Sequence, residues 1–134
     1  MSLVARATTP SMDASTGMFA PQITGLVAGE DLDIAAPCYI KSSDGKVYMS
    51  NGTAANEAAK FHGFAPRACK SGQAVTLFAL GTRFSYGTGL TIGEKYYIGA
   101  TAGWLDGAAT TGDSVGVAAA ITATDIIVTR AAGA

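Results

Sequence analysis

Short runs of alternating apolar and polar residues, separated by turn signals, fill the chain from Gly25 onward. Residues 74–80 are apolar at both alternating sets of positions, which predicts a central strand with two covered faces. Residues 37–49 predict a hairpin around Asp44-Gly45, a pair that readily adopts the positive φ angles of a tight primed turn. Short strands with turns roughly every eight to twelve residues predict an all-β fold, a compact barrel or sandwich with little helix.

This pattern occurs twice, in two units of about residues 25–80 and 89–130. The matches include Tyr39-Ile40 with Tyr97-Ile98, Gly63-Phe64-Ala65 with Gly116-Val117-Ala118, and Val75-Thr76-Leu77 with Ile126-Ile127-Val128. Their spacing changes only in the connections, as expected of a duplicated β-unit, because strands tolerate no slips whereas loops tolerate deletions. One unit alone would be marginal in size, so we expect the two copies to share a core.

Residues 1–22 differ from the rest of the chain. They are rich in Ser, Thr, Ala and Met and show neither a strand nor a helix period. We expect an extended or flexible N-terminal arm, followed by a single β domain over residues 23–134. Two interpretations of the arm stay open, a terminus without a role and an arm that binds a partner. Elsewhere, residues 53–60 predict a short helical turn capped by Thr53.

Charge is sparse: 14% of the 134 residues are charged and the formal net charge is −1. Such a chain offers no phosphate-binding stripe, which argues against DNA or RNA binding as its main function. No apolar run reaches the length of about eighteen residues that a membrane span needs. The start lacks a basic region ahead of an apolar stretch, so we expect no secretory signal and a protein assembled in the cytoplasm.

Residues suited to catalysis or metal binding are few. His62 is the only histidine, which excludes a His-pair metal site and favours a structural role over a catalytic one. Cys38 and Cys69 lack metal-ligand spacing; we expect reduced, small apolar residues, with a disulfide as the weaker alternative. We expect turn-forming roles for the aspartates Asp31, Asp33, Asp44, Asp106, Asp113 and Asp125. The sequence therefore predicts no enzyme, no metal and no cofactor.

The aromatic residues are the candidates for contact with partners. Tyr96 and Tyr97 are adjacent on a predicted strand, so they must point to opposite faces and one of them lies outside or in an interface. Exposed Tyr and Trp suit interfaces because they bury a large area at low entropy cost. For Trp104 an alternative is that it closes one end of the barrel, and sugar binding through the same aromatics also stays open.

A family resemblance rests on a succession of segments: Ala36-Pro37-x-Tyr39-Ile40, Asp44-Gly45-Lys46-Val47, a small-residue loop, Gly63-Phe64-Ala65, Val75-Thr76-Leu77 and Gly81-Thr82-Arg83-Phe84-Ser85-Tyr86. This order of strands and turns resembles that of tailed-phage capsid decoration (cement) proteins, of the lambda head stabilisation type and of the wider family with duplicated β-units. The likeness covers about residues 25–130. The second unit extends beyond the lambda-type pattern.

The resemblance implies a structural virion protein on the outside of an expanded phage capsid, assembled in the host cytoplasm. Such proteins commonly form trimers or dimers and clamp neighbouring major-capsid subunits against the pressure of packaged DNA. On this basis we expect the arm to contact the capsid through Leu3, Val4, Arg6, Pro10, Met12, Met18 and Phe19. We expect contact with sibling subunits through Tyr86, Tyr96 and Trp104. The partners would be the major capsid protein and further copies of this chain.

Two other functions stay open. A phage tail-fibre, baseplate or carbohydrate-binding β module could use the same β-unit and the same aromatic residues. A small hydrolase is the weakest alternative, because its catalytic residues would have to come from His62 and scattered aspartates.

Overall fold

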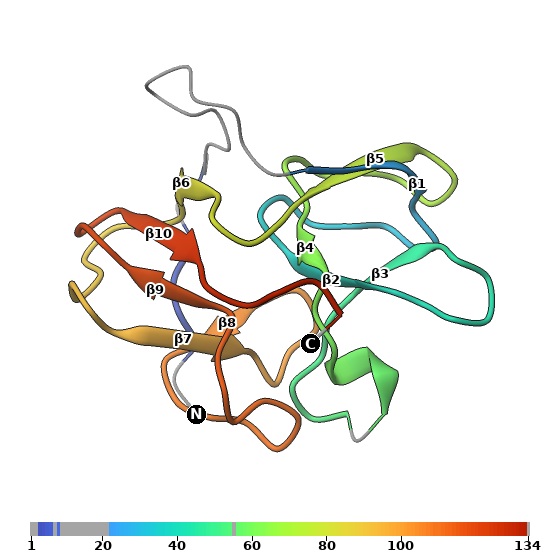
Figure 1. Ribbon diagram of the computed structural model, residues 1–134. Helices are drawn as coiled ribbons and strands as arrows, with labels where there is room; N and C mark the ends of the chain where they lie inside the picture. The colour runs from blue at the N-terminus through green and yellow to red at the C-terminus, as the bar shows by residue number, and fades with distance from the viewer. Residues whose placement is uncertain (1–2, 7, 9–21, 55, 134) are drawn as a thin grey trace.

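The computed structural model describes residues 3–6, 8, 22–54 and 56–133, which form ten strands and one short helix (Figure 1). The first sheet contains β1 (Gln22–Val27), β2 (Pro37–Ile40), β3 (Val47–Met49), β4 (Gly63–Phe64) and β5 (Ala74–Phe78). The second sheet contains β6 (Arg83–Ser85), β7 (Lys95–Ile98), β8 (Leu105–Asp106), β9 (Ala118–Ala120) and β10 (Asp125–Val128). Between β3 and β4 lies the 3-10 helix η1 (Glu57–Ala59).

The two sheets repeat one topology. The strand order is β1-β5-β4-β2-β3 in the first and β6-β10-β9-β7-β8 in the second, so each strand has its counterpart five strands later. Neighbouring strands pair antiparallel in both sheets. The prediction of an all-β sandwich built from two similar units with little helix is confirmed. The strand β5 lies inside its sheet, between β1 and β4, as its apolar residues on both faces predict.

The strand register corrects part of the predicted alignment between the units. Cys38 pairs with Gly63 across β2 and β4, whereas Tyr96, the counterpart of Cys38, pairs with Ala118 across β7 and β9. Gly63 therefore corresponds to Ala118, and its predicted match with Gly116 is wrong. The alignment of β5 with β10 also shifts by two residues, in the opposite direction, so that Leu77 corresponds to Ile126. The pattern of apolar and polar residues does not reveal this difference in register, because a shift of two residues keeps every side chain on its own face of the sheet.

The predicted hairpin around Asp44-Gly45 forms, but its turn is longer than expected. Lys41 and Lys46 close the loop through a backbone hydrogen bond of 2.9 Å, and Gly45 alone of the loop residues has a positive φ, of 71°. Asp44 instead uses its side chain, whose Oδ1 accepts the Lys46 N–H at 2.9 Å. An aspartate that bonds the backbone two residues later replaces the primed turn that the dipeptide predicted.

The helical turn is shorter than predicted and has a different cap. It covers Glu57–Ala59, and the side chain of Asn56 accepts the N–H of Ala58 at 3.0 Å. Thr53 is therefore not the cap, because it lies in the preceding turn, where its N–H and hydroxyl donate to Asn51 Oδ1 at 2.9 and 2.7 Å.

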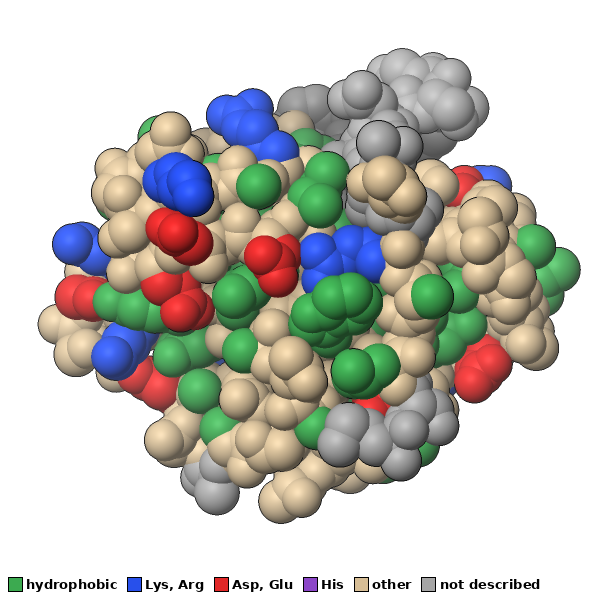
Figure 2. Space-filling model, turned by 180° about the vertical axis from the view of Figure 1, so that it is seen from behind, with side chains coloured by type: hydrophobic (Ala, Val, Ile, Leu, Met, Phe, Trp, Pro, Cys, Tyr) green, Lys and Arg blue, Asp and Glu red, His purple; other side chains and the backbone are tan. Residues whose placement is uncertain are grey.

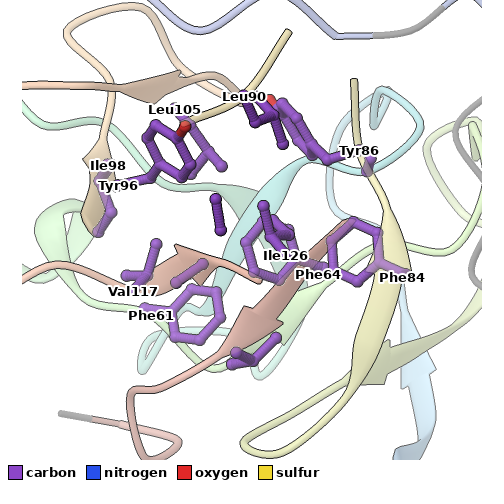
Figure 3. Packing of buried hydrophobic residues seen from close by; sticks show 14 residues of the cluster. Phe61, Phe64, Phe84, Tyr86, Leu90, Tyr96, Ile98, Leu105, Val117 and Ile126 are labelled. Carbon is purple, nitrogen blue, oxygen red and sulfur yellow. The ribbon is translucent and has the colours of Figure 1, made fainter. Parts of the chain in front are cut away.

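The larger of two buried clusters joins the two units. Residues of the second unit dominate it, and the first contributes Ala35, Phe61 and Phe64. A row of edge-to-face rings crosses the boundary, with centroid distances of 5.2 Å for Phe61–Phe64, 5.1 Å for Phe64–Phe84 and 6.2 Å for Phe84–Tyr86 (Figure 3). Such rings bury large areas and add about 0.5–1.5 kcal/mol per pair through their geometry. The predicted shared core is confirmed, and a smaller cluster fills the first unit alone.

Glycines let the backbones of the two units touch. Gly52 N–H donates to Gly99 O at 2.7 Å, and Gly112 N–H donates to Gly52 O at 2.6 Å. A Cβ on Gly52 would overlap Ile98 O and Thr110 Oγ1, and one on Gly103 would overlap Met49 Sδ. The seam between the units is therefore a close approach that larger residues would force apart.

We expect Gly52→Ala to lower the free energy of unfolding by about 3 kcal/mol, because the added methyl group meets backbone and side-chain atoms across the seam. Gly72→Ala is the matched control, because a Cβ on Gly72 would meet no neighbouring atoms. Only the positive φ of 90° disfavours alanine at this position. Its cost should be about 1 kcal/mol. Urea unfolding of both variants measures the difference; equal losses would show that the seam is not tightly packed.

Candidate functional site

His62 is part of the scaffold. Its Nδ1 accepts the backbone N–H of Ile40 at 3.1 Å, which requires that nitrogen to be unprotonated. Burial, and to a lesser extent the charge of Lys60, lowers the pKa of His62. Within the described ranges no group of three His, Cys, Asp or Glu side chains is placed to hold a metal ion.

The two cysteines are buried and unlinked, as predicted for small apolar residues. The thiol of Cys38 donates to Ala36 O at 3.3 Å in the interior of the first unit. Burial raises the pKa of Cys38 well above its ordinary range, so the reactive thiolate is suppressed.

Asp113 has more than the predicted turn role. Its Oδ1 accepts the N–H groups of Val115 and Gly116 at 3.0 and 2.8 Å, and its Oδ2 accepts the N–H of Ile98 at 2.8 Å. Its fully buried carboxylate also pairs with Arg130 Nη1 at 3.1 Å. This ion pair ties the end of the chain to β7, and sequence reasoning missed it because Arg130 lies beyond the last strand, without a pattern of its own.

Two of the three aromatic residues predicted at a subunit interface lie in the core. Tyr86 is fully buried and Tyr96 is 3% exposed, so neither can reach a sibling subunit as the protein stands, and the expectation that they are exposed is wrong. On β7, Tyr96 points inward with Ile98, which leaves Tyr97 as the partly exposed member of the pair. Figure 3 shows Tyr86 and Tyr96 among the core side chains.

Trp104 is the third aromatic residue, and it reaches the surface only in part. The guanidinium of Arg6 lies over its ring, 4.3 Å from the centroid. Arg6 also donates to Ile34 O at 2.5 Å and to Gly103 O at 2.9 Å, so it contacts both units at once. Burial raises the pKa of Tyr86, and the neighbouring Arg6 opposes this shift. Arg6 and Trp104 thus form a cation–π contact that fastens the N-terminal segment across the seam.

The first residues of the predicted arm pack on the fold. Leu3 pairs antiparallel with Asp106, and the Val4 N–H donates to Leu105 O at 3.0 Å. Val4 packs against the larger core cluster, while Leu3 stays 44% exposed. Of the predicted capsid-contact residues, Leu3, Val4 and Arg6 therefore lie beside β8. The others, Pro10, Met12, Met18 and Phe19, lie outside the described residues.

The surface of the described residues carries dispersed apolar and charged groups. The most exposed large apolar side chains are Ile92 at 70% and Val115 at 62%, which lie in separate loops. On the face seen in Figure 2, basic and acidic side chains are scattered among apolar ones. This arrangement suits contact with another surface better than the capture of a charged polymer.

We expect acid to remove the stability that neutral His62 contributes. Because the pKa of His62 in the folded protein lies below its ordinary 6.5, the unfolded chain takes up this proton first as the pH falls. The contribution is complete above pH 6.5 and is lost as the pH falls through the folded pKa. His62→Asn can accept the same hydrogen bond without titrating. The variant should flatten the pH dependence of the free energy of unfolding as the pH falls below 6.5; an unchanged slope would contradict the assignment.

The buried ion pair should matter far more than an exposed one. Arg130→Ala leaves the Asp113 carboxylate buried without its cation and should lower the free energy of unfolding by about 3 kcal/mol at pH 7. Arg83→Ala is the control, because Arg83 pairs at 3.0 Å with Asp125 but is 56% exposed. Its loss should stay below about 1 kcal/mol. Chemical denaturation distinguishes the two, and similar small losses would mean that Asp113 is held by its backbone donors alone.

Among the described residues, no helix is long and apolar enough to cross a membrane. No protein-family model matches the chain, and no curated protein matches it.

Proposed function

We propose that this chain is a structural virion protein that binds the outer surface of a tailed-phage capsid. It stabilises the expanded shell by clamping neighbouring major-capsid subunits, without catalysis. The observation that carries this proposal is the tandem repeat of one five-stranded unit. The succession of sequence segments that form this unit resembles that of phage cement proteins.

The way in which the units are joined supports a clamping role. A clamp must resist being sheared when the subunits it bridges move apart. The shared aromatic core and the glycine seam join the two units over a continuous packed interior, which deforms little under load. A body of this kind transmits force between two attachment points.

The surface also fits a binding role on a lattice. With 14% charged residues, the protein loses little hydration of charged groups when a face is covered. Individual contacts can then be weak, because many copies on one shell, or two contacts per copy, raise the overall affinity. In this proposal residues 9–21, which include Pro10, Met12, Met18 and Phe19, supply one of those contacts.

A carbohydrate-binding or tail module remains the second candidate, because aromatic side chains reach the surface. Two of these rings have a cation against one face, however: Arg6 lies over the Trp104 ring, and Lys41 Nζ lies 5.0 Å from the centroid of the Tyr48 ring. Sugars stack on open aromatic faces, so these contacts favour the capsid proposal.

We expect deletion of residues 9–20 to weaken binding to expanded capsids of the same phage at least about tenfold and to leave the fold intact. The deletion starts after Thr8 because Leu3, Val4 and Arg6 belong to the packed structure. A variant with the same segment replaced by Gly and Ser at equal length is the control for spacing. Co-sedimentation with capsids measures binding, and the thermal midpoint checks folding.

The same measurement separates the alternatives. Binding that is unchanged by the deletion removes the arm from the proposal. If the intact protein fails to bind expanded capsids and is found instead with purified tails, the tail-module function replaces the capsid function.

A further inference from the structure

Each sheet has an outer strand edge that must be covered, and the first unit covers its own. Directly after β1, Ala28 forms a parallel bridge with Val47 of β3, and the Gly29 N–H donates to Val47 O at 2.8 Å. Since β1 and β3 lie at opposite edges of the sheet, this bridge closes the first unit on itself. Closure satisfies the backbone groups that an open edge would expose.

The second unit covers the equivalent edge with residues from the far end of the chain. Ile40 pairs with Val47 in the first unit as Ile98 pairs with Leu105 in the second, so Leu105 is the counterpart of Val47. The donor to Leu105 O is the Val4 N–H, at 3.0 Å. The N-terminal segment, residues 3–6, thus covers the edge of β8 in the way that the residues after β1 cover the edge of β3. In Figure 1 this segment is the blue trace that passes the second sheet.

The contacts that the structure describes for the N-terminal segment lie close together. Leu3 pairs with Asp106, Val4 bonds Leu105 and packs on the core, and Arg6 bonds two carbonyl oxygens and covers the Trp104 ring. All of these partners belong to the body of the protein. Because these contacts all come from residues 3–6, the segment can make the same contacts on any copy that offers a free β8 edge.

The covalent connection allows such a transfer. Residues 7–21 join Arg6 to β1 and can span at most about 50 Å when extended. A domain of this length has a radius of gyration of about 14 Å. The N-terminal segment can therefore reach the β8 edge of a copy that lies in contact with its own.

We propose that the β8 edge is a strand-exchange site, at which residues 3–6 of one copy replace those of a second copy of this chain. The closed and exchanged forms make identical contacts, so the balance between them depends on how closely the copies are held. Copies concentrated to the order of 1 mM, in solution or on a surface, become linked through their N-terminal segments. The proposal stands independently of the capsid function.

Cross-linking tests the exchange with full-length chains. Leu3→Cys and Asp106→Cys are placed in separate chains, one of them labelled with nitrogen-15, and mixed under oxidising conditions; Cys38 and Cys69 stay buried. We expect a disulfide between positions 3 and 106 of different chains, identified by mass, whose yield rises with protein concentration. The double variant in one chain is the geometric control and should close internally. If the double variant closes while the mixture forms no such bond up to about 1 mM, the proposal is overturned.

A second measurement covers the case in which Asp106→Cys fails to fold. Tagged and untagged chains of the natural sequence are mixed, and the tagged chains are recovered with time. Arg6→Ala removes the main fastening of the segment, so it should speed the appearance of untagged chain in the recovered fraction at least about tenfold. Arg67→Ala, an exposed arginine outside the segment, should leave the rate unchanged. Recovery of tagged chains alone at every concentration would also overturn the proposal.

Discussion

The structure depends on the aromatic packing that the two units share. The first unit has a small interior of its own, but its second face presents Phe61, Phe64 and Phe78 to the cluster of the second unit. The second unit has no separate core cluster among the described residues, because its buried strand residues pack in that same shared cluster. Neither unit could bury these rings without the other, so the pair forms one cooperative body.

Much of this architecture could be predicted from the sequence, because strands and turns leave a local signal. The alternation in β5 and the glycines at the turns identify the repeat and the fold class. Local signals do not fix everything: two neighbouring tyrosines must face opposite ways, but nothing in Tyr96-Tyr97 says which one faces the core. The two-residue difference in the alignment of β4 with β9 has the same origin, since a pattern with period two is unchanged by a shift of two residues.

The long-range contacts of the candidate site were harder to predict from the sequence than its strands and turns. The pairing of the N-terminal segment with β8, and of Arg130 with Asp113, joins parts of the chain that are far apart in sequence. Neither end carries a regular hydrophobic period, so both look like free termini when only periodicity is considered. Arg6 illustrates the point: a lone cation in a Ser- and Ala-rich stretch lies between two carbonyls and an indole ring.

The unequal closure of the two units limits how this protein could have grown by duplication. The first unit is self-sufficient at its outer edge, whereas the second relies on a strand that precedes the first in the gene. Reversing the order of the halves, or appending a third copy of the second half, would create a module whose last strand lacks a neighbour. The two halves share one strand order but are therefore not interchangeable parts.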